Sequence, residues 1–155
     1  MIKKIITATI LSAMTLFALP NNELELALIT KAAQKKGIVL MNMHLEGETK
    51  AKFGNLYDEY QIKLMELSIK KLTLIKNYAQ SFQNMTDDNA NKLLNEWIAV
   101  DKATTELKSS YMSKFKKVMP SADVIRYFQI ENRIGLVKGA EIANLLPLAM
   151  PKSAE

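Results

Sequence analysis

A single apolar stripe in the middle of the chain constrains the fold more than any other feature. Between residues 47 and 83, large apolar side chains recur at alternating spacings of four and three residues, and only Lys71 interrupts them. The stripe consists of Phe53, Tyr57, Tyr60, Leu64, Leu67, Leu74 and Tyr78. This spacing predicts one amphipathic helix of about 35 residues, roughly 50 Å long. So long a helix favours an elongated hairpin or coiled-coil-like packing.

The remaining sequence after residue 20 also has helical spacing, with scarce glycine and no strand-like alternation. We expect further helices over about 23–43, 86–119 and 121–146. Gly37 disfavours a helix by about 1 kcal/mol relative to alanine, so the first segment is expected as one helix or as two with a break there. Thr86 is the predicted N-cap of the next helix, which Pro120 is expected to stop.

The connection between the second and third helices is short, spanning residues 84–86. A short connection forces its two helices to be antiparallel neighbours. The predicted fold is therefore all-α: an elongated helical bundle built on a long antiparallel hairpin, with flanking N- and C-terminal helices. It forms one domain over residues 21–150, with a disordered tail at 151–155. Trp97 is expected as a core anchor at the centre of the hairpin, whose wide stripe must be covered by other helices or by a second copy.

The N-terminus predicts export. Lys3 and Lys4 precede an uncharged apolar run over residues 5–19, and polar residues follow Pro20. This order is typical of a secretory signal, here residues 1–20. The apolar run is shorter than the roughly 20 residues that a membrane-spanning helix needs. We therefore expect a periplasmic protein.

Charge and cysteine content exclude several classes of function. Removal of two lysines with the signal lowers the formal charge of +5 to +3, and this charge is spread along the chain. A nucleic-acid-binding protein would concentrate lysine and arginine on one face, so no nucleic-acid partner is expected. The chain has no cysteine. Neither a disulfide nor a thiolate metal site can therefore form.

Residues 40–61, which read LMNMHLEGETKAKFGNLYDEYQ, resemble the LTxxQ-motif periplasmic proteins, the Spy/CpxP-like family. In that family an apolar helix, a Leu-Thr-x-x-Gln turn and an aromatic-x-x-aromatic-x-x-Tyr helix recur. Phe53, Tyr57 and Tyr60 stand in the aromatic places, whereas the turn at residues 45–49 keeps only the leucine. Residues 85–89 form a second partial copy, and residues 115–146 are similar to the C-terminal part of exported helical proteins in this group.

The resemblance implies an all-helical, often dimeric, cradle-shaped protein. The family includes an ATP-independent chaperone, a modulator of an envelope-stress sensor kinase and metal-responsive relatives. Its roles give two hypotheses for this chain. One is a chaperone-like protein that holds unfolded or membrane-associated envelope proteins. The other is a regulatory adaptor that docks on an envelope-stress or metal-responsive membrane sensor.

Five residues are candidates for contact with a client or partner. Phe53, Tyr57 and Tyr60 either pack between helices or form a client-binding surface, because tyrosine combines an apolar ring with a polar tip. Arg126 and Arg133 lie in the densely polar stretch RYFQIENR. This stretch suggests hydrogen bonds between helices, with a partner site as the alternative.

The sequence shows no catalytic constellation. His44 is the single histidine, and no nucleophile motif surrounds it. His44 and Glu48 share helical spacing, but two ligands do not make a zinc site, and Gly47 suggests a break between them. His44 is more simply a residue at a helix C-terminus. No enzyme activity, cofactor or metal is expected.

Overall fold

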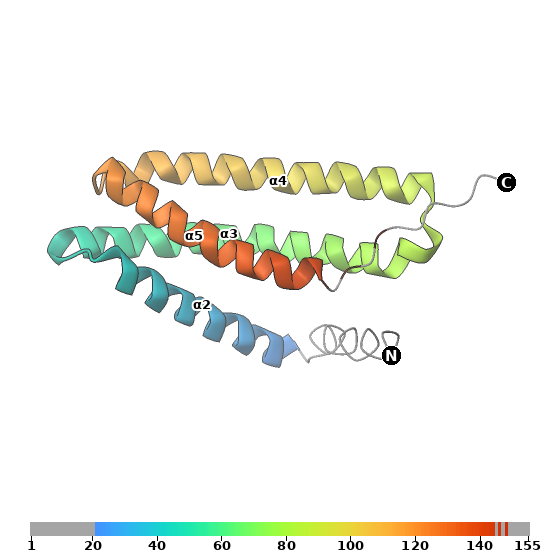
Figure 1. The fold of residues 1–155 in the computed structure, drawn as a ribbon, viewed down its shortest axis with the longest axis horizontal. Coiled ribbons are helices and arrows are strands. Elements are labelled where there is room, and N and C mark those ends of the chain that lie inside the picture. The colour runs from blue at the N-terminus through green and yellow to red at the C-terminus, as the bar shows by residue number, and fades with distance from the viewer. Residues whose placement is uncertain (1–20, 145, 147, 149–155) are drawn as a thin grey trace. The chain divides into compact units, whose positions relative to one another are not determined.

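The computed structural model describes residues 21–144, 146 and 148, and every regular element in this part of the chain is helical. The elements are α2 (Asn21–Met43), α3 (Gly47–Ser81), the 3-10 turn η1 (Phe82–Asn84), α4 (Asp87–Phe115) and α5 (Ser121–Ala143) (Figure 1). The predicted all-α class is confirmed. The predicted signal of residues 1–20 and the predicted tail of residues 151–155 lie outside the described residues.

Helices α3 and α4 begin where local sequence signals place them. The stripe that opens at Phe53 forms the single long helix α3. Thr86 is the N-cap of α4, and its hydroxyl accepts a hydrogen bond of 3.3 Å from the Asn89 backbone N–H. Two aspartates follow in the first turn of α4, where the helix dipole favours negative charge.

Helix α4 ends earlier than the sequence predicted. It stops at Phe115 rather than near Met119. The backbone N–H groups of Lys117 and Val118 donate to carbonyls three residues earlier, so the last turn tightens before Pro120. Met119 is buried after this turn. Helix α4 thus ends in a tightened turn before it reaches Pro120. Pro120 directly precedes α5.

Helices α3 and α4 form the predicted antiparallel hairpin (Figure 1). Near the start of α3, the ring of Phe53 lies 5.5 Å from the ring of Phe115 at the end of α4. Farther along the hairpin, the Lys71 ammonium lies 3.0 Å from a carboxylate oxygen of Asp101. Residue numbers therefore rise along α3 as they fall along α4. The short connection through η1 imposes this direction.

The chain divides into two compact units, and the hairpin belongs to the unit formed by residues 45–125. The other unit contains α2 together with the part of α5 that begins at Arg126. Within it, Lys35 of α2 forms an ion pair of 2.7 Å with Glu131 of α5. The Arg126 guanidinium donates a hydrogen bond of 2.8 Å to the Asn42 backbone carbonyl. The single domain predicted for residues 21–150 stays a prediction.

Helix α2 is continuous through Gly37, so the alternative of two short helices is wrong. The penalty for glycine is only about 1 kcal/mol. Interactions with α5 on both sides of Gly37, at Lys35 and at Asn42, hold the two halves of α2 in place. Tertiary contacts here outweigh a local preference.

Two residues in the link between α2 and α3 have left-handed backbone conformations. His44 has φ 52°, and Gly47 has φ 54°. His44 directly follows the last residue of α2, the position where glycine commonly ends a helix. Glycine adopts this conformation without strain, whereas a side chain with a Cβ does not. His44 is exposed, so this strain has no evident compensation from burial.

We expect His44→Gly to raise the free energy of unfolding by about 0.5 to 1 kcal/mol, because relief of the left-handed strain exceeds the added backbone entropy of glycine. Gly47→Ala should have the opposite effect, since alanine is strained at φ 54°. Urea denaturation followed by far-UV circular dichroism measures both changes. Equal stability of all three proteins would contradict this account of the link.

Candidate functional site

An aromatic cluster forms the core of the hairpin at the end where α3 begins and α4 finishes. The ring centroids of Tyr60 and Tyr111 lie 5.2 Å apart, and Phe115 lies 5.5 Å from Phe53 and 6.3 Å from Tyr60. Tyr57 lies 6.0 Å from Phe53 along the same face of α3. Aromatic pairs at such distances stabilise a core beyond the area that they bury.

For Phe53, Tyr57 and Tyr60 the sequence left two alternatives, packing between helices and a client-binding surface. Their exposed fractions are 0%, 2% and 4%. These three rings therefore pack between helices, and the structure does not present them as a client-binding surface. Exposed apolar groups that can meet a partner lie elsewhere on the hairpin.

Tyr111 has two lysines against its ring. The ammonium groups of Lys63 and Lys114 lie 5.5 and 4.2 Å from the ring centroid. These are cation–π contacts, in which the negative face of the ring attracts the ammonium. The Tyr111 hydroxyl is buried and has no hydrogen-bond partner among the described residues. The ring, rather than the hydroxyl, makes the favourable contacts.

Because a buried hydroxyl without a partner is destabilising, Tyr111→Phe is expected to raise the free energy of unfolding by about 1 kcal/mol. Phenylalanine keeps the ring and therefore the contacts with Lys63 and Lys114. Urea denaturation measures the change. A loss of stability instead would show that the hydroxyl is hydrogen-bonded in solution.

Trp97 is not the core anchor that the sequence predicted. It lies on α4 with 38% of its surface exposed. The Lys71 ammonium lies 5.2 Å from the Trp97 ring centroid and also pairs with Asp101. Lys71, the polar break in the apolar stripe of α3, therefore reaches across to the edge of α4. Trp97 therefore packs against a charged side chain of the opposite helix.

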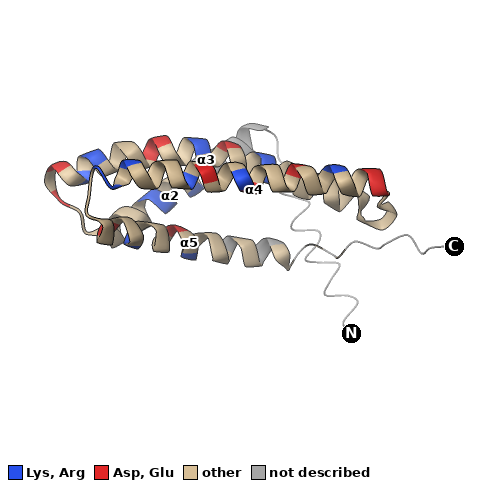
Figure 2. Cartoon of the chain, turned by 90° about the horizontal axis from the view of Figure 1, so that it is seen from above, with Lys and Arg blue, Asp and Glu red and all other residues tan. Residues whose placement is uncertain are grey.

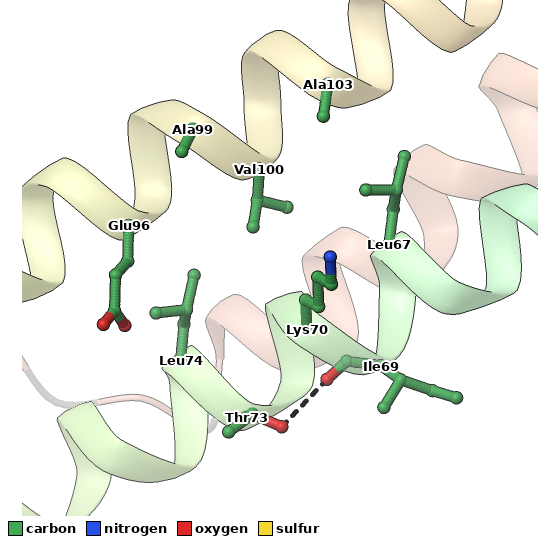
Figure 3. A pocket seen from close by; sticks show the side chains of 9 residues that line it. All are labelled: Leu67, Ile69, Lys70, Thr73, Leu74, Glu96, Ala99, Val100 and Ala103. Atoms are coloured by element: carbon green, nitrogen blue, oxygen red, sulfur yellow. Dashed lines mark hydrogen bonds between the residues drawn. The ribbon is translucent and has the colours of Figure 1, made fainter.

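A groove open to solvent lies between α3 and α4 farther along the hairpin, and its volume is about 390 Å³. Its lining residues are Leu67, Ile69, Lys70, Thr73 and Leu74 of α3 and Glu96, Ala99, Val100 and Ala103 of α4. In Figure 3 Val100 points toward α3, and Lys70 points toward α4. The groove is thus mostly apolar, with one basic and one acidic residue in its lining.

Exposed aliphatic side chains occur on both helices of the hairpin. Ile62 and Ile69 of α3 are 64% and 49% exposed, and Leu94 and Ile98 of α4 are 61% and 65% exposed. Single exposed apolar residues are ordinary, but apolar patches on a soluble protein commonly mark interaction sites. The groove and these side chains make the hairpin the candidate binding element.

The two candidate arginines differ in their surroundings. Arg126 donates to the Asn42 carbonyl across two helices, so the predicted hydrogen bonding between helices is confirmed for it. Glu131, in the same stretch, forms the ion pair with Lys35. Arg133 is exposed. A partner role for Arg126 and Arg133 stays a prediction.

Charges of both signs are interspersed along the hairpin, as Figure 2 shows for α3 and α4. Among the residues that the structure describes, no group of three or more histidine, aspartate or glutamate side chains is placed to hold a metal ion. Within the same residues, none of the helices has both the length and the apolar character needed to cross a membrane.

Comparison of the chain with protein-family models, curated proteins and solved structures gives no match. The resemblance to the LTxxQ-motif proteins therefore stays a prediction.

The sequence did not predict the groove. One signal for it was present: Ala99 and Ala103 lie one helical turn apart beside the large apolar residues of α4. Small residues on one edge of an apolar stripe leave space against a neighbouring helix. That space becomes a groove only because Leu67 and Leu74 of α3 line the opposite wall.

Proposed function

We propose that this chain is an exported periplasmic binding protein that holds envelope proteins in a chaperone-like manner without ATP. The observation that carries the proposal is the apolar groove of the hairpin, which is open to solvent. Elsewhere on the same two helices, isoleucine and leucine side chains are also exposed. Unfolded proteins expose apolar segments that such a surface can cover.

The charges of the hairpin support the same role. Lysine side chains near the apolar surface attract acidic segments of a client and increase the rate of encounter. Acidic residues interspersed among them do the same for basic segments. A surface that combines apolar groups with both signs of charge suits unrelated clients better than a surface of one sign.

The test is light scattering of two unrelated denatured proteins, each diluted into buffer with the chain and without nucleotide. We expect near-stoichiometric suppression of aggregation for both clients. Suppression of neither would overturn the proposal. It would favour the alternative, a regulatory adaptor docking on an envelope-stress or metal-responsive sensor, since an adaptor recognises one partner rather than many.

A pair of variants links the activity to the apolar surface. Ile69→Gln removes an exposed aliphatic side chain of the hairpin, and we expect it to weaken suppression several-fold. Lys76→Gln changes an exposed residue of α3 outside the groove, and we expect it to have no effect. Both variants place glutamine, a good helix former, at an exposed position.

A further inference from the structure

The groove offers few polar groups to the backbone of a bound segment. The hydroxyl of Thr73 already donates a hydrogen bond of 3.1 Å to the Ile69 carbonyl. The other polar residues of the lining are Lys70 and Glu96. An extended peptide would lose water from the N–H and C=O groups that face this lining and would find few replacement partners there, which is costly. A helix satisfies these groups internally, so the groove favours a helical occupant.

The spacing of the walls also fits a helix. Leu67 and Leu74 are seven residues apart on α3, and Ala99 and Ala103 are four apart on α4. Side chains repeating at three to four residues leave holes that receive knobs of the same period from another helix. The seven-residue step corresponds to roughly 10 Å, or about two turns of a bound helix. The two alanines allow the bound helix to come close.

Two charges of opposite sign complete the lining. Lys70 belongs to α3 and Glu96 to α4, and neither has an ion-pair partner in the described part of the chain. Glu96 lies at the Leu74 end of the groove, whereas Lys70 lies between Leu67 and Leu74 (Figure 3). On a bound helix, the charges that complement Lys70 and Glu96 would therefore lie on opposite sides of its apolar face.

We propose that the groove binds an amphipathic helix of a client, with an aliphatic face bordered by an acidic side chain facing Lys70 and a basic side chain facing Glu96. The inference rests on the proposed function, because it names the kind of client segment that the hairpin holds. Apolar burial in the groove provides affinity, and the two charges select the segment.

The test uses three labelled helical peptides of about 15 residues, a length at which isolated helices are marginally stable in water. All carry the same leucine face. One has glutamate on one border and lysine on the other, the second has lysine on both, and the third has glutamate on both. Fluorescence anisotropy measures their binding to the full chain and to the charge-reversal variants Lys70→Glu and Glu96→Lys.

For the unaltered chain we expect the mixed peptide to bind at least about fivefold more tightly than the other two. Lys70→Glu makes both border residues acidic and should shift the preference to the all-lysine peptide. Glu96→Lys makes both basic and should shift it to the all-glutamate peptide. Equal binding of the three peptides, or the same preference in all three proteins, would overturn the proposal.

A variant that fills the groove tests whether the peptide binds there. Ala99→Leu combined with Ala103→Leu fills the groove from α4 and should weaken binding of the mixed peptide more than tenfold. Ala79→Leu makes the same change at an exposed position outside the lining and should leave binding unchanged. Unchanged binding to the double variant would place the peptide elsewhere and refute the groove as its site.

Failure of the inference is distinguishable from failure of the proposed function. Aggregation suppression by the unaltered chain is measured in parallel with peptide binding. If suppression is absent, the chaperone-like function fails, whatever the peptides do. If suppression is present while peptide binding is unchanged by the charge reversals and by the filled groove, only the helix-binding groove is rejected.

Discussion

Replacement of Phe115 by alanine is expected to lower the free energy of unfolding by about 3 to 5 kcal/mol, which is close to the largest cost of a single core substitution. Phe115 is fully buried and its ring lies near those of Phe53, Tyr60 and Tyr111. These neighbours come from both helices of the hairpin. They cannot all move inward to fill the space that the ring leaves.

The measurement is urea denaturation followed by the fluorescence of Trp97, the single tryptophan of the chain. Because Trp97 lies on α4, its signal reports directly on the hairpin that Phe115 stabilises. A loss below about 1 kcal/mol would be inconsistent with a well-packed cluster at this position.

Trp97→Ala provides the contrast, with far-UV circular dichroism as the signal in place of fluorescence. Truncation of a core tryptophan would lower the free energy of unfolding by several kcal/mol, whereas we expect a loss of about 1 kcal/mol for Trp97, which is 38% exposed. Its contribution comes from partial apolar burial and from the contact with the Lys71 ammonium. A loss as large as that of Phe115→Ala would show that Trp97 is buried in solution.

The second large effect concerns the ion pair between Lys35 and Glu131. We expect Lys35→Met to lower the free energy of unfolding by about 2 to 3 kcal/mol, since it removes the Lys35 ammonium from its contact with a largely buried carboxylate. The two side chains are only 15% and 10% exposed. This burial separates the pair from Lys52 and Glu48 on α3, whose exposed contact contributes little.

The double variant Lys35→Met with Glu131→Leu is expected to recover most of the lost stability. Two apolar side chains of similar size replace the pair without a buried charge, an exchange that is often neutral or stabilising. Lys52→Met at the exposed pair is the control and should change stability by less than about 0.5 kcal/mol. All four proteins are compared by urea denaturation with far-UV circular dichroism. A double variant as unstable as Lys35→Met alone would contradict the explanation.

Local sequence signals suffice to predict the all-helical class, the long helix α3 and its pairing with α4. A helix requires apolar residues on one face, and the stripe from Phe53 to Tyr78 meets this condition over the whole of α3. The N-cap at Thr86 is equally local, because its hydroxyl bonds a backbone group three residues away. The short connection then permits only an antiparallel arrangement.

Which apolar residues are buried and which remain accessible depends on how the helices pack, and the sequence does not specify this. Periodicity marks a face but not how far around the helix a neighbour covers it, so Phe115 and Trp97 were indistinguishable in sequence. Their burial depends on the register of α3 against α4, which brings Phe53 to Phe115 and Lys71 to Trp97. The same register sets Ala99 and Ala103 across from larger side chains of α3. The groove therefore arises from residues about thirty positions apart, and no local pattern specifies it.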